Sequence, residues 1–367
     1  MNILAVMPTY RSSHYSGKVG GGEISNRILL EGLANRGHSV TVCTLDPGPD
    51  QETYRNGVKV IGSRVPDNES TIGKIIRIKR YKKFIEQAIR SSEIDIVLTG
   101  TYGINSSLLV AKKYNIPVAA FVRAFENFES FKNTNNIFRF IVRILVYGDF
   151  GVGSLRKLDY LFPNSKFMAD ICGKHTSTSK VKVIYPALHI DNVREVKRSP
   201  QPRNIFMIGS SDHKGFPIFK DLASDFPELS FHVVGDPTLN PGSEYRRGNL
   251  TFHGWGNVVE ILSNEADLLL VPSTWREPFG RVAVEGLISG TPTLVSDIGG
   301  LPEAVNFEKK LLVKPSKKGA WRKAIFDFIT SPDEVFIATQ RAQNNVKNFS
   351  AERQVSELET FIQDSLR

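Results

Sequence analysis

The sequence has few cysteines, no long apolar run and no motif of metal ligands. Cys43 and Cys172 are too few for a disulfide framework or a cysteine-based metal site, which favours the reducing cytosol. The nearest approach to a membrane span, Ile141–Tyr147, is broken by Arg143, and a span needs ~18 apolar residues. No Asp-x-Asp occurs on a predicted loop, and no His, Cys and carboxylate cluster has metal-ligand spacing. We therefore expect neither a metal ion nor another cofactor.

Charge of one sign is in excess. The 47 Lys and Arg residues outnumber the 38 Asp and Glu residues, which gives a net charge of +9. Such a balance favours anionic partners: nucleotides, polyphosphates, acidic membrane surfaces or nucleic acid. Nucleic acid is the least favoured of these, because the sequence has no zinc finger, RRM aromatic motif or KH loop. We expect no nucleic-acid partner.

The stretch Pro272–Glu303 predicts a strand–helix–strand unit. The segment before it, Ala266–Val271, reads as a buried strand with the apolar run Leu268–Val271, and Thr291–Ser296 reads as the next strand. The helix between them, Arg281–Ser289, follows a loop marked by proline and glycine and ends before a glycine. Such a unit predicts a parallel sheet, with ligands bound at the carboxyl ends of its strands.

Two glutamates in this stretch are candidate ligand contacts. Glu285 lies eight positions after Glu277, a spacing that does not repeat one helical face. Both can therefore face one crevice only if Glu277 precedes the helix. Gly280 and the first helical turn would offer backbone N–H groups to an anionic or polyhydroxyl ligand. From spacing alone, the simpler explanation is a surface loop glutamate and an ordinary helix glutamate.

The order of elements in the N-terminal segment is typical of a dinucleotide- or phosphate-binding unit. Strand Ile3–Met7 is followed by Gly20–Gly22, helix Glu23–Arg36 and strand Ser39–Thr44. The first run lacks a preceding basic segment, so it predicts a strand and not a signal peptide. The glycines are not spaced G-x-G-x-x-G, which argues against a hydride-transfer cofactor. They allow a diphosphate to approach the backbone, or they form a flexible hinge.

A second α/β unit begins after a polar, proline-containing boundary at Pro186–Arg203, which follows a predicted strand Val181–Tyr185. Its first strand, Asn204–Ile208, runs into a loop bounded by glycines that carries Lys214. The ammonium group can neutralise a diphosphate, although most loop lysines are only solvated. Helices are predicted at 320–330, 332–348 and 350–366.

The sequence Glu-Pro-Phe-Gly at 277–280, with Glu285, Ser-Gly-Thr-Pro at 289–292 and Asp-Ile-Gly-Gly-Leu-Pro-Glu at 297–303, resembles the donor-site signature of retaining GT-B glycosyltransferases of family 4. The resemblance loosely covers nearly the whole chain. It implies two Rossmann-like domains that face each other across a cleft. Residues 1–187 with the returning helix 350–367 would form the acceptor-side domain, and 188–349 would form the nucleotide-sugar domain.

The resemblance also implies roles for particular residues. Glu277 and the N–H groups of Phe279 and Gly280 would hold the donor sugar, Glu285 would bind the ribose, and Lys214 would neutralise the diphosphate. The predicted catalytic residues are Glu277 and Lys214, and the predicted donor or nucleotide contacts are Gly21, Gly22, Ser210, Lys214, Gly254, Trp255, Asn257, Pro278, Phe279, Gly280 and Glu285.

Two positions depart from the family pattern. Ser210 stands where the family often has an arginine, and the loop is one residue short, so neutralisation depends more on Lys214. Arg123 stands where many relatives have a histidine that faces the donor sugar. Arg123 then contacts phosphate or an anionic acceptor, or it is a structural arginine paired with Glu126 or Glu129.

The resemblance predicts a metal-independent, retaining transferase that moves a sugar from a UDP- or GDP-sugar to a glycan or lipid-linked acceptor, in synthesis of cell-surface polysaccharide or glycolipid. A sugar-nucleotide epimerase and a non-catalytic nucleotide-sugar-binding protein remain alternatives. The basic stretch Lys74–Phe84 either docks on an anionic membrane surface or is a solvated helix face. We expect a cytoplasmic protein, peripheral on the inner face of the membrane if that stretch docks.

Overall fold

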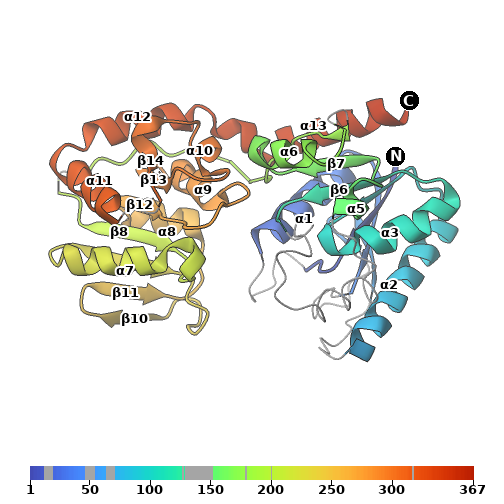
Figure 1. The fold of residues 1–367 in the computed structure, drawn as a ribbon, viewed down its shortest axis with the longest axis horizontal. Coiled ribbons are helices and arrows are strands. Elements are labelled where there is room, and N and C mark those ends of the chain that lie inside the picture. The colour runs from blue at the N-terminus through green and yellow to red at the C-terminus, as the bar shows by residue number, and fades with distance from the viewer. Residues whose placement is uncertain are drawn as a thin grey trace. The chain divides into compact units, whose positions relative to one another are not determined.

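The computed structural model describes residues 1–11, 20–45, 54–62, 71–125, 128, 152–177, 180–199, 201–315 and 318–367. They form two compact units (Figure 1). Unit 1 comprises Met1–Leu188 with Ala351–Arg367, and unit 2 comprises His189–Ser350. The segment Asn127–Tyr147, which has Phe, Ile and Leu residues at mixed helical spacing, lies outside the described residues apart from Phe128. Among the described residues, no helix is long and apolar enough to cross a membrane.

Unit 1 is built on a seven-stranded sheet of order β3-β4-β2-β1-β5-β6-β7, parallel except for β3. The strands are β1 (Asn2–Met7), β2 (Ser39–Thr44), β3 (Tyr54–Arg55), β4 (Val58–Gly62), β5 (Ile96–Thr99), β6 (Val118–Val122) and β7 (Tyr160–Pro163). The helices are α1 (Gly21–Asn35), α2 (Thr71–Ser91), α3 (Ile104–Ala111), α5 (Val152–Leu155), α6 (Lys166–Gly173) and α13 (Ala351–Leu366), and the 3-10 helix η2 (Lys112–Tyr114) extends α3.

The alternation of side chains along β1 divides the core of unit 1 between two faces. Ile3 and Ala5 pack in one cluster with Leu33 of α1 and Leu358 of α13. Leu4 packs in the other cluster, with residues of α2 and α3. Because successive strand residues point to opposite faces, a fully buried run such as this one predicts a sheet covered on both sides.

Unit 2 repeats the plan with the order β10-β11-β9-β8-β12-β13-β14, parallel except for β10. The strands are β8 (Asn204–Ile208), β9 (Ser230–Val234), β10 (Glu244–Arg247), β11 (Leu250–His253), β12 (Leu268–Val271), β13 (Thr293–Ser296) and β14 (Leu312–Val313). The helices are α7 (Phe216–Asp225), α8 (Val258–Glu265), α9 (Arg281–Ile288), α10 (Leu301–Ala304), α11 (Lys318–Thr330) and α12 (Asp333–Gln343), with 3-10 helices η6 (Asp212–Lys214), η7 (Lys309–Leu311) and η8 (Val346–Phe349).

Both sheets are doubly wound. From β1 in unit 1 and β8 in unit 2, the chain builds the sheet first in one direction and then in the other. The strand order therefore reverses between β1 and β5 and between β8 and β12. In open α/β sheets, ligands bind outside the carboxyl ends of the strands at such switch points.

The predicted strand Val181–Tyr185 is wrong. Val181 forms only an isolated bridge to Leu161. Lys182 and Ile184 donate backbone hydrogen bonds to Leu161 and Pro163, at 3.0 and 2.9 Å. In this parallel register the bond returned to Lys182 would come from Pro163, which has no N–H, so no continuous ladder forms.

The single helix predicted at 332–348 is also wrong. α12 ends at Gln343, and η8 follows it. Asn344 and Asn345 lie between the two helices, and the side chain of Asn348 donates to that of Asn345. Asparagine competes with the helix for its own backbone hydrogen bonds, which explains the break.

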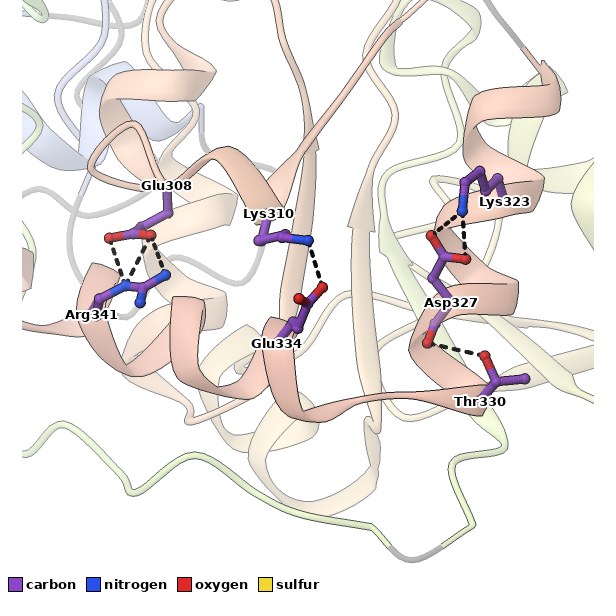
Figure 2. A network of polar contacts seen from close by, with 7 residues as sticks. All are labelled: Glu308, Lys310, Lys323, Asp327, Thr330, Glu334 and Arg341. Carbon is purple, nitrogen blue, oxygen red and sulfur yellow. Dashed lines mark hydrogen bonds and ion pairs between the residues drawn. The ribbon is translucent and has the colours of Figure 1, made fainter.

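Ion pairs on the surface of unit 2 connect α12 to the segment around η7 (Figure 2). Arg341 pairs with Glu308 at 3.0 Å and Lys310 with Glu334 at 2.5 Å. More than half of the side-chain surface of Arg341, Lys310 and Glu334 is exposed, so each pair contributes at most ~1 kcal/mol. The buried Phe336 of the same helix, packed edge-on against Phe328 of α11, is the stronger anchor.

Candidate functional site

Two loops of unit 2 lie against each other at the β8/β12 switch point. Residues 209–215 follow β8, and residues 272–280 follow β12. Thr274 donates its N–H and its hydroxyl to the carbonyl oxygen of His213, at 3.0 and 3.2 Å. A Cβ on Gly215, whose φ is +87°, would lie 1.9 Å from the carbonyl oxygen of Pro272. Only glycine permits this contact.

Lys214 lies at the carboxyl end of β8, as predicted from the sequence. Its side chain folds over Gly209, because a Cβ there would lie 3.3 Å from the ammonium nitrogen. Ser210 is half-buried beside it. In this part of unit 2 the charged group therefore stands above the strand end, where an anionic ligand of a doubly wound sheet binds.

Glu277 is oriented by a buried serine. The hydroxyl of Ser273, which is 0% exposed, donates to Oε1 of Glu277. The backbone carbonyl of Glu277 accepts a hydrogen bond from the N–H of Gly300 at 2.7 Å. The carboxylate is thus held by both its side chain and its main chain.

The glycine turn after β13 lies against the loop that carries Glu277. A Cβ on Gly299 would lie 2.5 Å from the carbonyl oxygen of Glu277, and a Cβ on Gly300 would lie 2.5 Å from that of Pro278. A Cβ atom does not approach a carbonyl oxygen this closely, so any side chain at either position must displace the loop. The conformation at Glu277 therefore depends on these two glycines.

The N-terminus of α9 opens beside Glu277. Gly280, with φ +111°, caps the helix, and as a glycine it has no side chain to bond to the first N–H groups. The first N–H groups of a helix have no partner within it, so they are donors for an oxygen-rich ligand. Phe279 is buried and packs edge-on against Phe349, with 5.1 Å between ring centroids. This contact fixes the point at which α9 begins.

Glu285 lies on α9, where the sequence predicts it, and has a partner that was not foreseen. Its Oε1 accepts a hydrogen bond from Nε of Arg281 at 2.7 Å. The i,i+4 spacing of the two residues was the available signal. A carboxylate can accept further hydrogen bonds, so this ion pair orients Glu285 without occupying it fully.

The segment at the end of β11 combines predicted contacts with structural roles. The ring of Trp255 lies against Gly235, where a Cβ would approach it to 2.9 Å, and its buried indole N–H has no hydrogen-bond partner among the residues that the structure describes. Gly254 packs against the carbonyl oxygen of Asn240. Asn257 caps α8, since its side chain accepts the N–H of Glu260 at 3.4 Å. A nucleotide would have to share Asn257 with this cap.

Of the glycines Gly20–Gly22, Gly22 lies beside Arg123 in unit 1. The Cδ of Arg123 is 3.5 Å from the place of a Cβ on Gly22, in the first turn of α1. Nε of Arg123 donates to Oδ1 of Asn26 at 2.7 Å, and the guanidinium lies 5.1 Å from the ring centroid of Phe121. Glu126 and Glu129, the partners considered from the sequence, lie outside the described residues. Asn26, one turn after Gly22, was not anticipated.

Two aromatic groups were missed in the sequence. Trp275, 37% exposed, meets His213 edge-on at 5.3 Å; His213 directly precedes Lys214, and Trp275 lies two residues before Glu277. The second group lies within the sheet, where His232 stacks on Phe206 at 4.5 Å and its Nδ1 lies 3.0 Å from Nε2 of His253. Burial, together with the charges of His253 and Arg246, lowers the pKa of His232 to about 4. That imidazole is neutral at pH 7.

No group of three or more His, Cys, Asp and Glu side chains in the described part of the chain is arranged to hold a metal ion. The chemical resources at the β8/β12 edge are instead one ammonium group, one oriented carboxylate, a helix N-terminus and an exposed indole. Together they can hold a ligand that is anionic at one end and rich in hydroxyl groups at the other.

Two family models together match almost the whole chain. The model for glycosyltransferase family 4 matches residues 19–192, and the model for glycosyl transferases group 1 matches residues 189–349. The chain is 27% identical over 331 residues to an uncharacterized 42.6 kDa protein in the cps region of Klebsiella pneumoniae, covering 83% of this chain and 87% of that one. It is 39% identical over 88 residues to D-inositol 3-phosphate glycosyltransferase of Rhodococcus erythropolis, covering 24% and 20%.

Solved structures confirm the predicted GT-B fold. Sucrose-phosphate synthase from Thermosynechococcus elongatus superposes with a TM-score of 0.78 at 16% identity, covering 100% of this chain and 99% of that one. HepE from Anabaena, solved with UDP and glucose, gives a TM-score of 0.73 at 17% identity and covers 99% of both chains. WaaG, a glycosyltransferase involved in lipopolysaccharide biosynthesis, gives 0.68 at 16% identity, covering 98% and 99%.

Proposed function

Because this chain belongs to the family 4 glycosyltransferases of the GT-B fold, we propose that it moves a sugar from a UDP- or GDP-sugar to a glycan or lipid-linked acceptor with retention of anomeric configuration. The observation that carries the proposal is the pairing of the Lys214 and Glu277 loops at the β8/β12 switch point. The complexes of HepE with UDP-glucose support a UDP-sugar as the first donor to test.

In this mechanism different residues of unit 2 contact different parts of the donor. The carboxylate of Glu277 and the first N–H groups of α9 hold the sugar hydroxyls, and Glu285, oriented by Arg281, accepts from the ribose. The ring of Trp255 and the neighbouring backbone receive the base. Two acidic residues with different surroundings thus act on different parts of one substrate.

The chemical step requires stabilisation of the leaving diphosphate. Cleavage of the bond between sugar and phosphate places positive charge on the sugar ring and negative charge on the diphosphate. Lys214 and the N-terminal dipole of α9 oppose that negative charge at fixed positions, and electrostatic stabilisation of this kind usually contributes more to catalysis than any other effect. We propose that no metal ion takes part, because Lys214 and the backbone donors supply the positive charge.

The setting we propose is synthesis of a cell-surface polysaccharide or glycolipid in the cytoplasm. Relatives named for the cps region, and the lipopolysaccharide enzyme WaaG among the neighbours in fold, support it. The basic helix α2 is then one place for docking on a membrane. Lys79, Arg80 and Lys83 are exposed on it, whereas Tyr81 is 3% exposed and packs in the core. The contribution that we propose for these three basic residues is electrostatic.

A thermal-shift screen of nucleotide sugars tests the proposal. A ligand at ~100 times its dissociation constant adds ~2.7 kcal/mol to the free energy of unfolding, which is easily measured. The stabilising donor is then incubated alone and with acceptors, and the products are separated. Transfer to an acceptor supports the proposal. An epimeric sugar nucleotide formed from donor alone identifies an epimerase instead, and binding without any turnover identifies a non-catalytic binding protein.

A further inference from the structure

A cavity of about 840 Å³ opens in unit 1 at the amino-terminal edge of the sheet. Its walls come from α3 and η2, from the start of β6 and from the turn before β7. α3 follows the carboxyl end of β5 and runs back along the sheet, so η2 lies at the opposite edge from Gly22 and Arg123. The cavity is therefore separate from the predicted phosphate-binding turn of unit 1.

The rim of the cavity is basic. Lys112, Lys113 and Lys157 line it and are exposed. The acidic residue in the lining, Asp159, accepts the N–H of Val118 at 2.8 Å through its side chain. Its own N–H donates to the carbonyl of Val118 at 2.9 Å, so Asp159 ties β6 to the turn before β7. The net charge of the lining residues is therefore positive, which favours an anionic ligand.

The walls below the rim are apolar. Leu108, Ile116 and Pro117 are half-buried in the lining, and Leu109 is 55% exposed at its edge. A cavity of this size is far larger than one phosphate and lies within the range of sites that hold a whole small molecule. An exposed leucine surrounded by lysines is typical of a protein surface that binds at a membrane interface.

The basic surface continues from the cavity to α2. Nε of Arg90 on α2 donates to the hydroxyl of Tyr114 on η2 at 3.2 Å. Lys79, Lys83 and Arg90 fall on one face of α2 by the helical period, and all three are exposed. Glu86 on the same face pairs with Arg90 at 2.9 Å and offsets one of these charges, so the surface that continues from the cavity to α2 takes its net positive charge from Lys79 and Lys83.

We propose that this cavity receives the phosphate headgroup of an anionic phospholipid, with Leu109 entering the interface between headgroups and acyl chains. The lysines hold the phosphate oxygens as ammonium donors, and the apolar walls cover the glycerol region. Charge and apolar lining together favour a bilayer lipid over a soluble phosphate. The inference does not depend on the proposed function, because binding to vesicles requires neither donor nor acceptor.

The test is sedimentation of the whole chain with vesicles of phosphatidylcholine, with and without phosphatidylglycerol, at low salt. The pair Lys112→Gln/Lys113→Gln should lower the partition coefficient about thirtyfold, from roughly fivefold per lysine. Leu109→Ser should lower it severalfold without changing any charge. The matched control Lys59→Gln/Lys220→Gln removes two charges from exposed residues elsewhere and should change it less than twofold.

The outcomes separate the sources of binding. If the control pair lowers the partition coefficient as much as the cavity pair does, the vesicles attract the whole cationic surface and the cavity binds no headgroup. The same conclusion follows if Leu109→Ser partitions like the wild type. Equal sedimentation with neutral and anionic vesicles overturns the proposal as well. If the chain does not sediment with vesicles but binds glycerol phosphate at the cavity, the ligand is a soluble phosphate. Thermal midpoints of each variant confirm that unit 1 is folded.

Discussion

Lys214→Ala is the most informative single perturbation of the proposed site. The ammonium group lies over Gly209 at the end of β8, where an incoming diphosphate would meet it first. The residue belongs to a short 3-10 helix and is half-buried, so its removal leaves no cavity in the core. The free energy of unfolding should change by less than ~0.5 kcal/mol.

The effect on turnover should be much larger than the effect on stability. At an effective dielectric constant of ~20, one unit charge 4 Å away is worth ~4 kcal/mol. Removing one preorganised donor at a site of developing charge costs ~3 kcal/mol, or roughly a hundredfold in turnover. Lys220→Ala, six residues on and exposed on α7, removes the same charge from outside the site and should keep full activity.

The assay is steady-state transfer from the donor found in the thermal-shift screen, with thermal midpoints as the check on folding. Turnover should also persist in excess chelator. If chelation abolishes turnover and Mg²⁺ or Mn²⁺ restores it, the site holds a metal and the reasoning is wrong. If Lys214→Ala keeps near-normal turnover, the cation comes from elsewhere, and Arg281 and Arg123 are next to test.

Three further predictions test the site and the sheet beneath it. Glu277→Gln should mainly lower turnover and Glu285→Ala should mainly weaken nucleotide binding, so equal loss of nucleotide affinity in a titration would contradict the division of roles. Trp275→Ala, at an exposed indole, should raise KM for donor or acceptor severalfold at an unchanged thermal midpoint; unchanged kinetics would remove Trp275 from the site. The pKa of His232 is lowered to about 4, so the folded state binds fewer protons than the unfolded state, and the free energy of unfolding should fall as the pH drops from about 7 towards 4. Because His232 is partly exposed, His232→Gln should reduce this fall in the free energy of unfolding by only on the order of 1 kcal/mol, as measured in urea titrations at several pH values. An unchanged pH dependence would assign the fall to other groups.

Strands that are apolar throughout were predictable from the sequence. β8 has the predicted bounds, Asn204–Ile208, and all of β6 (Val118–Val122) is buried and apolar, because a strand buried on both faces is apolar at nearly every position. β10, with the sequence Glu-Tyr-Arg-Arg, was missed because all four residues are exposed and carry no apolar alternation. The failure at Val181–Tyr185 came from Pro163 on the neighbouring strand, a cause that no local pattern contains.

Partners of the site residues were less predictable than their positions. The motif located Glu277, Lys214 and Glu285, but it did not disclose that Ser273 orients the first or that Arg281 pairs with the last. Such contacts depend on which rotamers the packed loops allow. Both pairs lie four residues apart, so the spacing can be read from the sequence, but the rotamers that bring the two side chains together cannot.

The glycines of the motif are best explained by packing, and this changes how the motif should be interpreted. Gly215, Gly299 and Gly300 each lie where a Cβ would meet the backbone of another segment at 2.5 Å or less. None of them offers a side chain to a ligand. They allow three loops from β8, β12 and β13 to meet at one edge, and that meeting brings Lys214 and the Glu277 carboxylate to the same switch point. A chain with both charged residues but with alanine at Gly300 should therefore fold, because the turn lies outside the strands, yet it should lose the geometry of Glu277 and most of its turnover.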